Sequence, residues 1–217
     1  MDAKRAPRSV LLTALLAAIV TVGALVGVAA MRAREDRPRE AAPVPPVSAQ
    51  PGTDCGDGPC KLLATRTVGA GAVELLADAQ GANGRFQADG QVVQTSITEL
   101  GGRLDPDSLT CVAASVSACL VSAPFSGGEL GELVVQRDGD WRAVAKPYFS
   151  DAGVIELGNV ANDDAPEVVV VQSSPALARV YALDGSVVGC TRKYSYPAQL
   201  RGWPQVRVLA SDLRACP

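Results

Sequence analysis

The sequence predicts an all-β domain of antiparallel, blade-like hairpins, arranged as part of a propeller or as a sandwich, and preceded by one transmembrane helix. From residue 60 onward, short runs rich in Val, Ile, Thr and Tyr are separated by Gly, Asp, Asn and Pro, which is typical of strands and turns. Asp-Gly lies between paired runs in RDGDW and LDGSV, a strong hairpin signal. The helix is predicted from a single uncharged apolar stretch near the start of the chain.

That stretch, residues 10–30, follows a basic segment, residues 1–9, which we expect to be a cytoplasmic tail. A helix of this length spans roughly 31 Å at about 1.5 Å per residue, close to the ~30 Å hydrocarbon core of a bilayer. The stretch is longer than the apolar part of a typical signal peptide, so we expect an uncleaved anchor. The alternative is cleavage after Ala29 or Ala30, which would release a secreted protein.

Residues 31–54 are predicted to form a stalk, because their second half is rich in Pro and favours an extended chain. Residues 55–217 form the predicted domain. Four Arg follow the apolar stretch, so the flanking charges alone do not settle its orientation.

All six cysteines follow the stalk, and their even number indicates disulfides formed in an oxidising compartment. We therefore expect a single-pass protein of the cell membrane with its C-terminal domain outside the cytoplasm. Six cysteines allow 15 connectivities, and the spacing favours pairing in sequence order: Cys55 with Cys60, Cys111 with Cys119, and Cys190 with Cys216.

Composition excludes several functions. The chain has no histidine, which removes Ser-His-Asp and Cys-His catalysis and zinc sites that use histidine. Residues 55–217 hold thirteen basic and eighteen acidic residues without a basic stripe, which argues against a nucleic-acid partner.

The expected strands fall into three units of about 50 residues, the size of a four-stranded propeller blade. Three units are too few to close a ring, so we expect an open assembly or a sandwich. The expected strands are residues 61–68, 72–78, 91–100, 109–114, 118–124, 131–138, 141–148, 153–160, 167–173, 178–184, 186–194 and 205–210.

The stretch GNVANDDAPEVVVV, residues 158–171, followed by ARVYALDGS, resembles a degenerate unit of the FG-GAP/VCBS family, the blade repeat of integrin-type propellers. The resemblance implies a weak Ca²⁺ site with Asn159, Asp163 and Glu167 as ligands. Ala161 stands at a further ligand position, and Asp164 replaces the usual Gly. The alternative is an acidic turn closed by Asn and Asp, with no cofactor.

The whole chain more broadly resembles membrane-anchored or secreted actinobacterial-type proteins that have no assigned activity, and the resemblance covers most of residues 55–217. CGDGPCKLL, SLTCVA, KPYFSDAG and VGCTRKYSYP carry this resemblance. It implies an extracytoplasmic domain.

Aromatic and cationic residues gather in residues 146–153 and 191–205, and they predict a shallow face for a glycan or a peptide. The candidates are Tyr148, Tyr194, Tyr196, Trp203, Arg192 and Arg201. The alternative is that the loop between Cys190 and Cys216 packs onto the core.

The expected function is therefore a non-enzymatic binding or structural module of the cell envelope. Its partner would be an envelope protein or a wall polymer, besides the membrane that holds the N-terminal helix. The rival functions are a calcium-stiffened module and a wall hydrolase that uses two carboxylates. The candidate carboxylates for hydrolysis are Glu99, Glu129, Glu132, Glu156 and Glu167.

Overall fold

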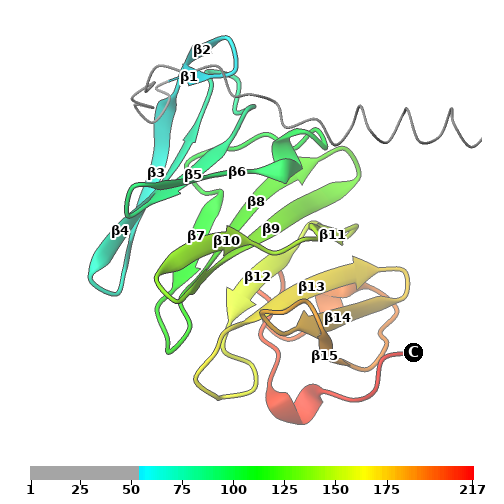
Figure 1. Ribbon diagram of the computed structural model, residues 1–217. Helices are drawn as coiled ribbons and strands as arrows, with labels where there is room; N and C mark the ends of the chain where they lie inside the picture. Colours follow the sequence, from blue (N-terminus) through cyan, green and yellow to red (C-terminus); the bar gives the residue numbers. More distant parts are fainter. Residues whose placement is uncertain (1–53) are drawn as a thin grey trace, which may run out of the picture. The chain divides into compact units, whose positions relative to one another are not determined.

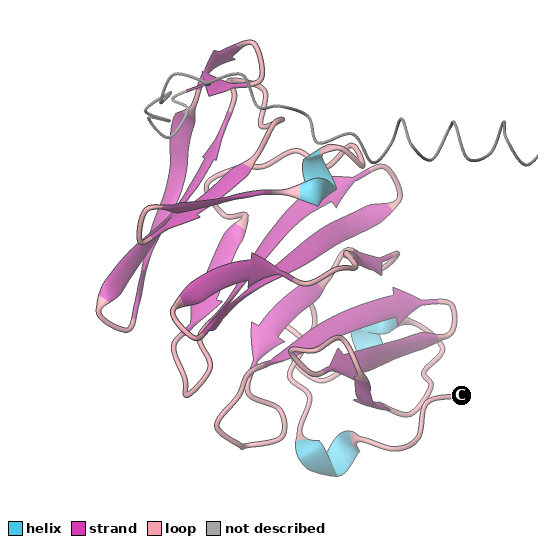
Figure 2. Cartoon of the chain, viewed as in Figure 1, coloured by secondary structure: helices cyan, strands magenta, loops and turns pink. Residues whose placement is uncertain are grey.

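The computed structural model describes residues 54–217, and this part of the chain is all β apart from three short 3-10 turns (Figures 1 and 2). The predicted tail, the predicted anchor and all but the last residue of the predicted stalk lie outside the described residues. Within residues 54–217, no helix has the length and apolar character needed to cross a membrane. The predicted antiparallel β domain is confirmed, and it consists mainly of three sheets that follow one another along the chain.

The first sheet is an antiparallel meander of β3 (Lys61–Val68), β4 (Gly71–Ala77), β5 (Arg85–Ala88) and β6 (Gln91–Gln94). Along β4, Val73, Leu75 and Ala77 are buried, and the residues between them face away from the core. Asp89 and Gly90 join β5 to β6 at positive φ, 49° and 77°, as a two-residue hairpin turn requires. This sheet therefore has one buried face and one open face.

The second sheet contains β7 (Leu109–Val112), β8 (Ala118–Phe125), β9 (Gly128–Arg137), β10 (Asp140–Ala143) and β11 (Tyr148–Ser150). The predicted hairpin at RDGDW is present, with Asp138 and Gly139 both at positive φ. Strands β10 and β11 pair with different parts of β9. A Cβ at Gly128 would meet the carbonyl oxygen of Ser150, so glycine allows β11 to approach β9 here.

The third sheet is a meander of β12 (Ile155–Gly158), β13 (Glu167–Ser173), β14 (Ala176–Tyr181) and β15 (Val187–Cys190). The predicted hairpin at LDGSV joins β14 to β15 through a longer turn than the one at RDGDW. Strand β13 is buried over five consecutive residues, 167–171. Such a run indicates that both faces of the strand are covered.

Apolar clusters fill the space between neighbouring layers. Phe86 of the first sheet contacts Trp141 of the second, with ring centroids 5.2 Å apart. Leu133 of the second sheet belongs to one cluster with Val168 of the third. The second sheet is thus covered on both faces, which explains the unbroken buried runs of β8, at 118–121, and of β9, at 130–135.

The C-terminal tail, residues 191–217, covers the outer face of the third sheet. Leu200, Val206 and Val208 of the tail pack against Val169 and Val180 of the sheet. The tail also contains the 3-10 turns η2 (Pro197–Gln199) and η3 (Ala210–Asp212). The expected strand 205–210 was wrong: Val206 and Val208 alternate as in a strand, but this segment crosses the face of the sheet and adds no strand to its edge.

Three glutamates, one buried and two half-buried, accept backbone hydrogen bonds that connect neighbouring layers. Glu132 Oε2 accepts a hydrogen bond of 2.6 Å from Ser96 N, just after the first sheet. Glu129 Oε2 accepts one of 2.8 Å from Ile155 N, at the start of the third sheet. Glu156 Oε1 accepts one of 3.1 Å from Val206 N in the tail. Burial raises the pKa of all three glutamates above the usual value, although the hydrogen bonds that they accept act in the opposite direction.

The three disulfides join the cysteines in the predicted order. Cys55–Cys60 closes a small hairpin of β1 (Asp54–Cys55) and β2 (Gly58–Pro59), which was not predicted. Cys111–Cys119 links β7 to β8. Cys190–Cys216 ties the end of the tail to β15.

Several further expected strands are shorter than the sequence suggested, among them β7, β12 and β15. The strand expected at 91–100 ends at Gln94 and is followed by the 3-10 turn η1 (Ser96–Thr98), whose Ile97 is buried. The strand expected at 141–148 is split into β10 and β11, because Pro147 lies between them and cannot donate a backbone hydrogen bond.

Candidate functional site

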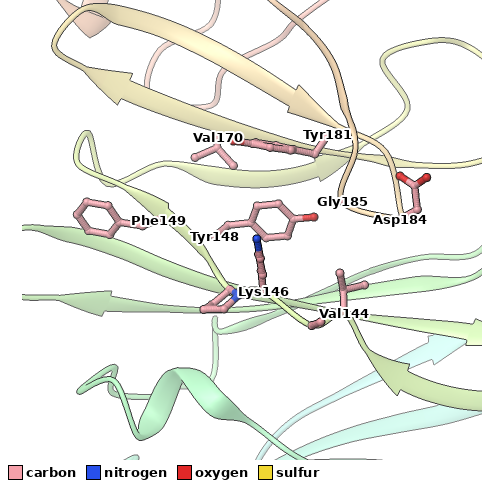
Figure 3. Close-up of a pocket in the computed structure, with 10 residues that line it drawn as sticks. Val144, Lys146, Tyr148, Phe149, Val170, Tyr181, Asp184 and Gly185 are labelled. Atoms are coloured by element: carbon pink, nitrogen blue, oxygen red, sulfur yellow. The ribbon is translucent and has the colours of Figure 1, made fainter. Parts of the chain in front are cut away.

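The candidate site that contains a sequence-predicted residue without a hydrogen-bond partner is a cavity of about 460 Å³ between the second and third sheets, which we call the seam cavity (Figure 3). Its volume lies within the ~300–1,000 Å³ typical of small-molecule sites. The second sheet contributes residues 144–149, and the third sheet contributes Val170, Tyr181, Asp184 and Gly185. The cavity is therefore built from segments that are distant in sequence.

Local structure explains how residues 144–149 reach this position. After β10 ends, Val144 N still donates to Leu133 O, which holds the chain alongside β9. The chain then leaves the ladder around Pro147 and rejoins β9 as β11. Along β11, Tyr148 and Ser150 are buried and Phe149 is exposed, so Tyr148 faces the third sheet.

Tyr148 is the central residue of the seam cavity. Only 8% of it is exposed, and its ring lies 5.1 Å from that of Tyr181, tilted by 58°. Within residues 54–217, its hydroxyl oxygen has no hydrogen-bond partner. Burial, followed by the nearby Tyr181 and Asp184, raises the pKa of Tyr148 to about 12, so the hydroxyl keeps its proton.

Asp184 provides a charged acceptor on the opposite side of the cavity. Figure 3 shows the Tyr148 hydroxyl directed toward the turn that carries Asp184 and Gly185. Asp184 Oδ1 accepts a hydrogen bond of 2.8 Å from Ser186 N. Hydrogen bonds from Ser186, side chain and backbone, hold the pKa of Asp184 below its usual value, so it remains an ionised acceptor at neutral pH.

These two groups offer a ligand one hydrogen-bond donor and one ionised acceptor. A hydroxyl can accept from Tyr148 and donate to Asp184 at the same time, whereas a pure acceptor would be repelled by the carboxylate. Tyr148, Phe149 and Tyr181 supply aromatic surface for an apolar ring face. Lys146 adds a cation, and its side chain rises toward the Tyr148 ring in Figure 3.

The other predicted aromatic residues lie in the tail and not with Tyr148. Tyr194 and Trp203 pack partly against the third sheet, and Tyr196 is 57% exposed. Arg192 lies over the ring of Tyr194, with its Cζ 4.7 Å from the centroid. Arg201 approaches Asp212 at 3.9 Å. The structure therefore does not bring the six candidates into one face.

The three predicted calcium ligands bind groups of their own loop. Asn159 Nδ2 donates to Asp163 O at 2.6 Å, and Asp163 Oδ1 accepts from Ala165 N at 2.9 Å. Glu167 Oε2 accepts from Val160 N at 2.7 Å. Within residues 54–217, no group of three or more acidic or cysteine side chains is arranged to hold a metal ion.

The candidate hydrolase carboxylates have structural partners as well. Glu129, Glu132 and Glu156 each accept a backbone N–H from the next layer, and Glu167 accepts one within its loop. Glu99 lines a separate small cavity of about 210 Å³, where it is the single carboxylate. None of these five residues lines the seam cavity.

Sequence reasoning found Tyr148 but missed Asp184 and Tyr181 as its neighbours. KPYF signalled Lys146 and Tyr148, because it places a cation and aromatics together. The stretch VYALDGS predicted a strand and a hairpin turn, and it formed part of the propeller-repeat resemblance, but it did not predict a cavity. Its part in the cavity follows from the packing of the third sheet on the second.

Comparison of the chain with protein-family models, with curated proteins and with solved structures gives no significant match. The function of the seam cavity is therefore argued from its own geometry.

Proposed function

We propose that this protein is a membrane-tethered, extracytoplasmic binding module without a catalytic role, and that its seam cavity binds a sugar unit of an envelope polymer. The observation that carries the proposal is the buried hydroxyl of Tyr148, which lacks a partner and is directed toward the turn that carries Asp184. A buried polar group without a partner is unfavourable, and a ligand hydroxyl would satisfy it.

The proposed location is supported by the disulfides and by the apolar stretch at 10–30. Three disulfides with no free cysteine among residues 54–217 are typical of an oxidising compartment. Protease added to cells stripped of their wall should therefore digest residues 55–217 without lysis. Protection of this domain until the membrane is broken would contradict the location.

Binding is tested by titrating the full-length protein, in mild detergent, with the tetramer of β-1,4-linked N-acetylglucosamine. Replacing Tyr148 with Phe keeps the ring packed against Tyr181 but removes the hydroxyl. We expect Tyr148→Phe to weaken binding about tenfold. Its free energy of unfolding should be unchanged or higher by up to about 1 kcal/mol, because an unsatisfied polar group is removed.

The matched control is Tyr196→Phe, because Tyr196 is an exposed tail tyrosine that the sequence had also suggested for binding. This control should bind like the native protein. Unchanged affinity of Tyr148→Phe, or no detectable binding of a sugar probe, would contradict the proposal. Cleavage of the tetramer, abolished by a single Glu→Gln substitution, would favour the hydrolase instead.

A further inference from the structure

We infer that the seam binds an extended anionic glycan, one that carries carboxylate or phosphate groups at intervals along a sugar or polyol chain. The inference rests on the proposed function, because the sugar site of the seam cavity supplies its central contact.

The seam cavity has a neighbouring cavity at each of two sides. A cavity of about 300 Å³ shares Val144 and Asp184 with it. A cavity of about 550 Å³ shares Phe149 and Tyr181 with it. The three hollows are thus adjacent, and together we call them the seam groove. A chain of several linked units could contact all three at once.

The seam groove is basic, although the domain is acidic. Its lining contains five cations and one acidic residue, Asp184: the cations are Arg137, Arg142, Lys146, Arg179 and Lys193. Residues 55–217 as a whole hold thirteen basic and eighteen acidic residues. Even if the carboxylate of Asp140, which pairs with Arg142, is added, cations outnumber anions five to two. This concentration of cations attracts a negatively charged chain.

Arg179 is the strongest indication of an anionic group. It lies on β14 opposite Val170, and its Nε is buried without a hydrogen-bond partner. The two ion pairs seen within the described residues, Arg142–Asp140 and Arg201–Asp212, involve neither Arg179 nor Lys193. A guanidinium binds carboxylate or phosphate through paired hydrogen bonds, and Lys193 adds a second charge in the same hollow.

The contacts on the seam groove favour a glycan over a nucleic acid. The Tyr148 and Asp184 pair suits a hydroxyl, and the carboxylate of Asp184 would repel a phosphate placed beside it. The anion is therefore expected next to Arg179 and Lys193, while a hydroxyl-bearing ring occupies the seam cavity between Tyr148 and Asp184.

The experiment compares four probes of similar length on the full-length protein. These are a hyaluronan oligomer, which carries carboxylates, a poly(glycerol phosphate) oligomer, the neutral N-acetylglucosamine tetramer and an oligo-dT. We expect one or both anionic glycopolymers to bind at least about tenfold more tightly than the neutral tetramer at low salt, and to lose this advantage at high salt. The two anionic probes separate carboxylate from phosphate recognition.

Arg179→Gln and Lys193→Gln locate the anion. Each substitution should lower the affinity for the anionic probe about tenfold and leave the affinity for the neutral tetramer unchanged. The matched controls are Arg201→Gln in the tail and Lys61→Gln on the first sheet, which lie outside the seam groove. A thermal melt of each variant shows that a loss of binding does not come from unfolding.

The outcomes separate the two proposals. Equal binding of neutral and anionic glycans, or anionic binding unaffected by Arg179→Gln and Lys193→Gln, overturns the inference and leaves the proposed sugar site intact. Absence of binding by every glycan probe overturns both. Tight binding of oligo-dT alone would assign the seam groove to nucleic acid and also overturn both.

Discussion

The first and third sheets have the same four-stranded antiparallel order, but they differ in what covers the face turned away from the second sheet. On the first sheet this face is open, and register places Thr65, Glu74 and Gln87 side by side on it. On the third sheet the same face carries Val169 and Val180 and is covered by the tail. The comparison teaches that topology does not determine burial. Whether the residues on each outer face are polar or apolar depends on whether another segment covers that face.

The largest expected effect comes from placing a charge on these two outer faces. Val180 on β14 is fully buried, and Val92 on β6 is 42% exposed. We expect Val180→Asp to lower the free energy of unfolding by about 3–5 kcal/mol, because it buries an unpaired carboxylate beneath the tail. Val92→Asp should cost less than about 1 kcal/mol. Urea unfolding of the two variants measures both values, and similar losses would break the comparison.

The next effect concerns the disulfides at the two ends of the domain. Cys190–Cys216 joins cysteines 26 residues apart, whereas Cys55–Cys60 joins cysteines 5 apart. Chain entropy predicts that replacing the first pair by Ser costs about 3.5 kcal/mol and the second about 2 kcal/mol. Hydrogen exchange should also show faster exchange at Val206 in the first variant, because the tail loses its anchor. An equal or reversed order of stabilities would contradict this account.

The smallest expected effect is on the pH dependence of the free energy of unfolding. Glu156, near the tail, and Asp78, just after β4 of the first sheet, should contribute slopes of opposite sign. Burial raises the pKa of Glu156, which contacts the tail, above the unfolded value of about 4.3. The folded state therefore binds this proton more tightly. The resulting stability is fully present below pH ~4.3 and is lost as the pH rises through the folded pKa. Glu156→Gln should flatten this part of the profile.

Asp78, after β4 of the first sheet, should behave in the opposite way. Desolvation acts to raise its pKa, but hydrogen bonds from Ala82, Asn83 and Gln80 outweigh it and lower the pKa. Its contribution is present above the unfolded pKa of about 3.9 and is lost as the pH falls through the folded pKa. Asp78→Asn should reduce the loss of stability in acid. Urea unfolding at a series of pH values measures both variants, and slopes of the same sign would contradict the contrast.

Local signals predicted much of the fold. Strands β3 and β13 match the expected ranges, because each is a long run of strand-forming residues with clear ends. The three disulfides follow from cysteine spacing alone. Strand β5 was missed because it has four residues, of which only Phe86 and Ala88 are apolar. The Asp-Gly pair at 89–90 was the available signal, identical to that at 138–139.

The site was less predictable, because it depends on contacts between sheets. The sequence identified Tyr148 but grouped it with the aromatic residues of the tail. Those residues are of the same chemical type, but they do not lie close to Tyr148 in the structure. Tyr181 and Asp184 meet Tyr148 only when the third sheet packs on the second. No spacing along the sequence contains this information.

The two terminal sheets of the domain are not equivalent, because the outer face of the third sheet is covered and that of the first sheet is not. Because residues 191–217 cover the outer face of the third sheet, a fourth sheet could not pack against it. The outer face of the first sheet stays open to the surroundings. A row of sheets built this way can be lengthened from its N-terminal side alone.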